Sequence, residues 1–133
     1  MFKVAAAQMK FARTIEDNLA GIERLLAEAS RRRADVVLFP ECATTGYAYD
    51  FAELRPAEVR SALTAVGRLA ARFRTNVLVG SPVFGRGKLY NGSYALRGME
   101  QPGFLAARWE QMVDAVRKRA ARSSLAFDLP EVC

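Results

Sequence analysis

Two stretches of the sequence place apolar residues at the spacing of an amphipathic helix. The first begins at Thr14, which with Asp17 resembles a capping box in which the hydroxyl accepts an otherwise unpaired backbone N–H. Its apolar stripe consists of Ile15, Leu19, Ile22, Leu25, Leu26 and Ala29. The second begins at Pro56, because proline suits the first turn of a helix. Its stripe consists of Val59, Leu63, Val66, Ala70 and Phe73.

Four other segments are typical of strands, namely residues 2–9, 35–39, 77–80 and 89–96. The second and third are short apolar runs without alternation, which is typical of strands buried on both faces. Pro40 ends the second run because proline cannot donate into a sheet ladder. Residues 43–55 are irregular, and residues 81–88 have the composition of a hairpin-like turn. The order of elements predicts an α/β fold in which helices cover a sheet.

The composition is that of a globular protein, with 51% hydrophobic and 26% charged residues. A chain of 133 residues is long enough for one domain. No apolar run approaches the about 20 residues of a membrane span, and the N-terminus has no apolar region of the signal-peptide kind. The two cysteines, Cys42 and Cys133, lie far apart in the sequence. We therefore expect a cytoplasmic protein with no disulfide and no membrane partner.

The sequence contains no histidine, which excludes Ser-His-Asp and Cys-His catalysis and the common zinc sites that use histidine. The net charge is +6, and the basic excess lies in the middle of the chain. Its arginines alternate with core positions and are not interleaved with exposed aromatic residues, so we expect a solvated helix face and no nucleic-acid partner. Gly80 and Gly85 have the spacing of a phosphate-binding loop, but Arg86 stands at the lysine position and a strand is predicted to follow instead of a helix.

The last part of the sequence has a different character. A helical stripe made of Leu105, Trp109, Met112, Val113, Val116 and Ala120 predicts a helix over residues 104–122, followed by a tail at 123–133. We therefore divide the chain into residues 1–97 and a divergent, helical C-terminal segment at 98–133.

Phe39-Pro40-Glu41 is the stretch with the most chemical content. It places a carboxylate just past the end of a buried strand, where α/β folds hold their ligands. A partly desolvated carboxylate at this position could serve as a general base. The alternative is a loop glutamate that faces water or accepts backbone N–H groups.

Several motifs, in order, resemble the opening of the nitrilase superfamily, the carbon–nitrogen hydrolases. They are Lys3–Met9, Asn18-Leu19, Ala34–Glu41, Thr45-Gly46-Tyr47, Val77–Gly80 and Lys88–Asn91. The resemblance covers residues 2 to about 97. It implies an α-β-β-α sandwich that hydrolyses nitriles, amides and carbamoyl compounds with a Glu-Lys-Cys triad and without a metal or organic cofactor. It also implies that Glu41 is the general base. Cys42, which does not match the nucleophile position, is interpreted as a small packed residue.

The match to the family pattern changes after residue 97. Glu110-Gln111 stand where the family has Arg-Lys. Lys118 is the candidate for the catalytic lysine, and the alternative is a solvated residue on the basic side of the predicted helix. Cys133, the last residue of the sequence, is the candidate nucleophile, and the alternative is a terminal thiol without a catalytic role.

The sequence therefore predicts the N-terminal part of a nitrilase-like hydrolase of non-peptide C–N bonds. We expect it to be truncated and inactive alone, with a small amide or nitrile as its substrate if active. Because layers of the sandwich are missing, apolar faces should be uncovered, which predicts a homo-oligomer or association through these faces. The alternative is a non-catalytic pseudo-enzyme or interaction module that associates through the same surfaces.

Overall fold

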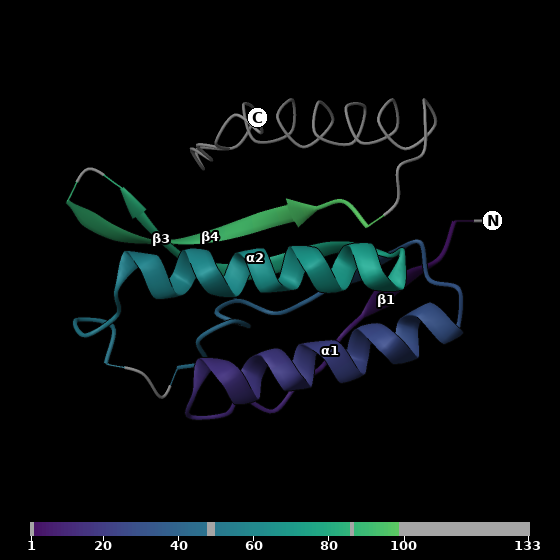
Figure 1. Ribbon diagram of the computed structural model, residues 1–133, viewed down its shortest axis with the longest axis horizontal. Helices are drawn as coiled ribbons and strands as arrows, with labels where there is room; N and C mark the ends of the chain where they lie inside the picture. The colour runs from purple at the N-terminus through teal and green to yellow at the C-terminus, as the bar shows by residue number, and fades with distance from the viewer. Residues whose placement is uncertain (1, 48–49, 86, 99–133) are drawn as a thin grey trace, which may run out of the picture. The chain divides into compact units, whose positions relative to one another are not determined.

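The computed structural model describes residues 2–47, 50–85 and 87–98 (Figure 1). The chain divides into two compact units, residues 1–99 and 100–133, and the described residues all belong to the first. Their elements are β1 (Val4–Ala6), α1 (Ile15–Arg31), β2 (Val36–Leu38), α2 (Pro56–Phe73), β3 (Asn76–Gly85) and β4 (Lys88–Leu96). The predicted order of strands and helices is confirmed for this part of the chain. The predicted helix at 104–122, the tail and the domain boundary at residue 98 lie outside the described residues or at their edge, and they stay predictions.

The four strands form one sheet in the order β1-β2-β3-β4. The first three strands are parallel, and Val37 of β2 pairs with Ala5 of β1 and Val77 of β3. The fourth strand is antiparallel to β3 and forms a hairpin with it. Each parallel connection passes through a helix, which is the usual way to join parallel strands. As a result, the carboxyl ends of β1 and β2 lie at the same edge of the sheet.

Both helices begin at the residues that the sequence predicts. The Thr14 side chain caps α1 by accepting a bond from the backbone N–H of Asp17 at 3.1 Å, and Pro56 is the first residue of α2. Figure 1 shows the two helices side by side, running in the same direction. Arg72 of α2 donates to Glu23 of α1 at 2.6 Å. Because this pair is exposed, it contributes at most about 1 kcal/mol, and packing holds the helices together.

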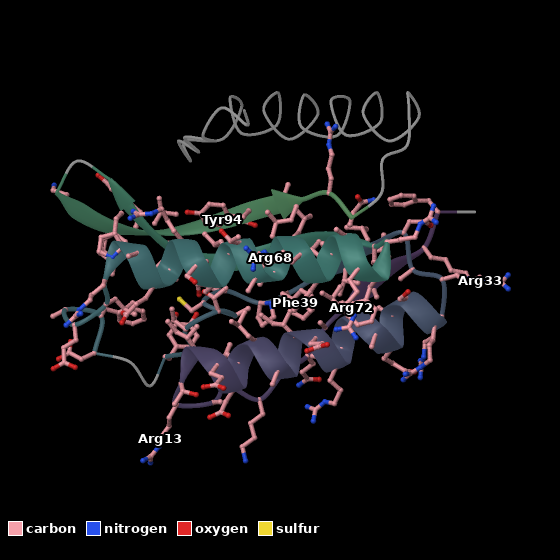
Figure 2. The ribbon with its side chains drawn as sticks, viewed as in Figure 1. Arg13, Arg33, Phe39, Arg68, Arg72 and Tyr94 are labelled. Atoms are coloured by element: carbon pink, nitrogen blue, oxygen red, sulfur yellow. The ribbon has the colours of Figure 1, made fainter. Side chains whose placement is uncertain are left out.

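The core lies between the two helices and one face of the sheet. Its buried residues are Ile22, Leu26, Ala29, Val37, Phe39, Ala43, Val66, Ala70, Val77 and Val79. Figure 2 shows Phe39 in the region between the helices, whereas Arg13 and Arg33 extend away from the ribbon. At about 25 cal/mol per Å² of apolar area removed from water, this cluster is the main source of stability in the described part.

The opposite face of the sheet is more open. Side chains alternate along each strand, so Val37 points toward the helices while Val4 and Leu38 point to the other side. Val4 is 56% exposed and Leu38 is 37% exposed. The prediction that residues 35–39 are buried on both faces is therefore wrong at Leu38, because no second layer among the described residues covers this side chain. The expectation of uncovered apolar surface in the molecule as a whole stays a prediction.

All four strands differ in their bounds from the predictions, and β1 and β3 differ most. The first strand is shorter than residues 2–9, and β3 continues past Gly80 through Pro82 into the hairpin, where a turn was predicted. The carbonyls of Leu78 and Gly80 face the β2 side, where they accept from Phe39 at 2.7 Å and from Ala43 at 2.9 Å. By alternation Pro82 presents its backbone on that same side, beyond the end of β2. The missing N–H of the proline is thus tolerated at an unpaired edge.

Within the described ranges, neither helix combines the length and the apolar character that a membrane crossing requires.

Candidate active site

The loop that follows β2 is folded back onto β3. Its Ala43 N–H donates to the Gly80 carbonyl oxygen at 2.9 Å. The N–H groups of Thr45 and Gly46 both donate to the carbonyl oxygen of Cys42, at 3.1 and 2.7 Å. Cys42 and Gly46 have φ angles of 52° and 67°, in the left-handed region that lets the chain reverse tightly. The loop is therefore a compact turn at the carboxyl edge of the sheet.

Gly80 fixes the height of this loop above the sheet. A Cβ atom at position 80 would lie 2.5 Å from the Cα of Glu41 and 2.6 Å from the carbonyl oxygen of Pro40. Both contacts are with backbone, so neither neighbour could move aside as a flexible side chain can. Only glycine allows this approach. The glycine that ends the apolar run 77–80 thus sets the position of the Glu41 backbone.

A buried hydroxyl pair anchors the loop a second time. The side-chain oxygens of Thr44 and Ser81 lie 2.6 Å apart, and both residues are fully buried. Because each hydroxyl is satisfied by the other, neither carries the penalty of an unpaired buried polar group. This pair joins the loop to the residue that follows Gly80 in β3.

Asn18 supports the loop from the side of α1. It is buried, and its side chain bonds the N–H of Ala12 at 2.8 Å and the carbonyl oxygens of Ala12 and Thr14 at 3.3 and 2.9 Å. A Cβ on Gly46 would meet the Ala12 oxygen at 2.9 Å. Asn18 therefore holds the segment before α1 in the shape on which the Thr45-Gly46-Tyr47 turn rests.

Glu41 itself is exposed and has one side-chain partner in the described part, the hydroxyl of Tyr47, which donates to its Oε2 atom. The carboxylate raises the pKa of Tyr47 to about 12, chiefly through this hydrogen bond. The expectation of a partly desolvated Glu41 is wrong for this structure. The buried positions of the loop are occupied by the following residues, 42–46, so the Glu41 side chain points to the outside. Its predicted position, just past the end of β2, agrees with the structure.

Tyr47 is a further residue of the site, and no role for it was predicted from the sequence. Its ring is 51% exposed and meets the ring of Phe11 edge to face, with centroids 5.3 Å apart and an angle of 88°. The signal in the sequence was a phenol six residues after a candidate base.

Cys42, next to Glu41, is a free buried cysteine that is 5% exposed. Burial raises the pKa of its thiol, and the negative charge of Glu41 raises it further. A nucleophilic cysteine needs the opposite shift, since the thiolate is the reactive form. The structure therefore agrees with the interpretation of Cys42 as a small packed residue.

The remaining partners of a Glu-Lys-Cys triad are not found around Glu41 in the described ranges. The lysines of these ranges are Lys3, Lys10 and Lys88. Lys3 donates to the Arg32 carbonyl oxygen at 3.3 Å, and Glu41 forms no ion pair in the part of the chain that the structure describes. Lys118 and Cys133 lie outside it. The catalytic roles of Glu41, Lys118 and Cys133 therefore all stay predictions. The described ranges also contain no cluster of acidic or cysteine side chains that could hold a metal ion.

The model of the carbon-nitrogen hydrolase family matches residues 3–122 of this sequence. The chain belongs to the carbon–nitrogen hydrolase family. This finding confirms the predicted membership. No curated protein matches the chain.

The fold is similar to solved structures of the same class. One is the NitN amidase of Nesterenkonia sp. AN1, which is 20% identical with a TM-score of 0.67, and the match covers 74% of this chain and 40% of that one. A second amidase structure from Nesterenkonia sp. is 22% identical, has the same TM-score of 0.67, and is matched over 73% of this chain and 38% of the amidase. A glutamine-dependent NAD(+) synthetase from Cytophaga hutchinsonii is 21% identical with a TM-score of 0.61, over 73% of this chain and 17% of the synthetase.

These similarities confirm the predicted α/β, nitrilase-type fold class. The match spans about two fifths of the length of the amidases. Other structures of the Nesterenkonia amidase contain butyramide, or carry the acetamide moiety of fluoroacetamide added covalently at the active site cysteine. Those ligands describe that amidase.

Proposed function

We propose that this chain carries the general-base part of a site that hydrolyses non-peptide C–N bonds, with Glu41 as the base. The observation that carries the proposal is the position of Glu41: it follows β2 at the carboxyl edge of the sheet, and Gly80 and the loop bonds fix its backbone there. This edge is where α/β folds hold their ligands. Family membership and the similarity to amidases support amides as the substrate class.

The proposed chemistry has one proton acceptor. The Glu41 carboxylate takes the proton of an attacking thiol and gives it to the amine that leaves as the C–N bond breaks. It then takes a proton from the water that hydrolyses the resulting thioester, and returns it to the thiolate that is released. By the family resemblance, a lysine stabilises the tetrahedral oxyanion. Lys118 and Cys133 are the candidates for these two groups. No organic cofactor or metal takes part in this scheme. A cytoplasmic location is part of the same proposal, and the sparse, distant cysteines support it.

We further propose that the chain is a truncated form of such an enzyme and is inactive by itself. Two observations support the proposed inactivity. The thiol beside Glu41 is Cys42, whose raised pKa disfavours the thiolate. Glu41 is exposed to water, and no cation is paired with it in the described ranges. Electrostatic stabilisation of the oxyanion accounts for most of the rate of acyl transfer. A site that has neither a paired cation nor a reactive thiol lacks it.

The test is an assay for ammonia release from acetamide, butyramide and acrylamide by the purified 133-residue chain. We expect no release above the buffer rate, and no mass increase after incubation with fluoroacetamide. Release that is lost in Glu41→Gln but retained in Glu53→Gln, an exposed loop glutamate, would disprove inactivity and support Glu41 as the base. Release that survives Glu41→Gln would disprove its role as the base.

The second candidate function is a non-catalytic module that associates with another copy of itself. It is favoured by the open outer face of the sheet, where Val4 is 56% and Leu38 37% exposed. Sedimentation velocity over a wide concentration range tests it. Association should weaken in Leu38→Lys and persist in Thr64→Lys, which adds the same charge on an exposed position of α2. A monomer at every concentration would exclude this candidate.

A further inference from the structure

Tyr47 and Glu41 are joined by a hydrogen bond between two exposed side chains of one loop. We propose that Tyr47 is the positioning residue of Glu41, holding one carboxylate oxygen so that the other stays free to accept a proton. This inference rests on the proposed function of Glu41 as a general base, and it adds the residue that directs the base.

The geometry around Tyr47 supports a fixed donor. Its ring is held edge to face by Phe11 at 5.3 Å between centroids. Its backbone follows Gly46, whose φ of 67° and close approach to the Ala12 oxygen leave no room for a Cβ. Ala12 is in turn held by the buried Asn18. The phenol is therefore attached to a supported turn, although its hydroxyl lies at the surface.

The acceptor is supported independently. The Glu41 backbone is fixed by its contact with Gly80 of β3, and the next residues are tied to the same strand through the Ala43 bond and the Thr44 hydroxyl. Donor and acceptor thus rest on different parts of the fold: α1 and its preceding turn on one side, β3 on the other. A hydrogen bond between such points selects one rotamer of each side chain, which a solvated glutamate alone would not keep.

The chemistry of the pair suits a base. A hydroxyl that donates to an ionised carboxylate makes a charge-assisted bond, which is stronger than a neutral one. The bond occupies Oε2 and leaves Oε1 with its acceptor capacity. The titratable groups that act on the Tyr47 hydroxyl are Glu41 and Cys42, and both raise its pKa, so the phenol stays protonated and donating at neutral pH.

The first test measures the pKa of the Tyr47 hydroxyl. Tyrosine ring carbons are labelled with ¹³C, and the intact chain is titrated by NMR. We expect the Tyr47 pKa near 12 in the wild type and a fall toward its ordinary value of 10 in Glu41→Gln. A Tyr47 resonance that titrates at the ordinary value in the wild type, or that keeps its raised pKa in Glu41→Gln, would overturn the proposal.

The second test measures the side-chain rotamer of Glu41. Side-chain couplings of Glu41 should report one dominant rotamer in the wild type and averaging over several in Tyr47→Phe, which keeps the ring against Phe11 but removes the hydroxyl. Tyr90→Phe is the matched control and should leave the Glu41 couplings unchanged. An unchanged single rotamer in Tyr47→Phe would overturn the positioning role. Neither measurement needs turnover, so the failure of this inference is distinguishable from failure of Glu41 as a base.

Discussion

Gly80 and Glu41 are in contact through their backbones: the space for a Cβ at position 80 is filled by the Cα of Glu41, at 2.5 Å. A strand residue and the candidate base are therefore coupled without any side-chain interaction. The consequence is that one methyl group on β3 should displace the candidate site.

Gly80→Ala should lower the free energy of unfolding by roughly 1–3 kcal/mol, because the added methyl collides with backbone that cannot rotate away. Denaturant unfolding measures this change. Gly67→Ala is the matched control, since a Cβ on Gly67 in α2 meets no atom within 4 Å. There the same substitution should be neutral or stabilising by up to about 1 kcal/mol, as alanine is the better helix former. Equal effects at the two glycines would contradict the close contact.

Asn18→Ala should destabilise the fold by about 1–3 kcal/mol, because it leaves the N–H and carbonyl of Ala12 without their partners in a half-buried segment. Thermal or urea unfolding would report the loss. Asn91→Ala, on an exposed position of β4, should change stability by no more than about 0.5 kcal/mol. If both variants behave alike, Asn18 is not the support that the hydrogen bonds indicate.

Replacing a leucine with alanine should lower the free energy of unfolding more on the helix-covered side of the sheet than on its open side. Leu26 is fully buried in the core, so Leu26→Ala should cost about 2–5 kcal/mol. Leu38 is 37% exposed on the outer face. Leu38→Ala should therefore lower the free energy of unfolding by roughly half as much or less. Unfolding is measured at low protein concentration, where association is minimal. Equal costs would mean that the outer face is covered in solution.

Cys42 should react slowly with iodoacetamide at neutral pH, because burial raises the pKa of its thiol and restricts access to it. The Cys133→Ser variant leaves Cys42 as the reporting thiol, and the urea-unfolded chain gives the reference rate. The raised thiol pKa also determines how the free energy of unfolding changes with pH. Folding is favoured by this group below the ordinary thiol pKa, and this contribution is lost as pH rises through the raised value. Rapid labelling of folded protein at neutral pH would contradict the buried thiol.

The helices were the part of the fold that the sequence specified best. Thr14 and Pro56 are local signals: each marks a helix start by its own hydrogen-bonding or backbone properties, independent of the rest of the chain. The position of Glu41 after β2 followed in the same way from the apolar run and Pro40. Such signals need no knowledge of the tertiary structure, which is why the structure agrees with them.

The remaining differences depend on neighbours that are distant in sequence. The exposure of Leu38 depends on whether another layer covers it. Pro82 can adopt the strand conformation because β2 ends before it. The role of Asn18 depends on Ala12 and on the Gly46 turn. The outward direction of Glu41 depends on the loop residues that occupy the buried positions. A pattern of apolar and polar residues carries no information on these pairings. The Tyr47 contact was missed for the same reason.

The bonds that join the loop after β2 to β3 also have a consequence for the order of folding. Phe39 and Ala43 donate to Leu78 and Gly80, which come much later in the chain and only after α2. Closing so long a connection carries an entropic cost that local helix formation does not. We therefore expect the helices to form early and the loop after β2 to reach its native shape late, when β3 docks. A newly made chain would then present its candidate base only once the parallel sheet is complete.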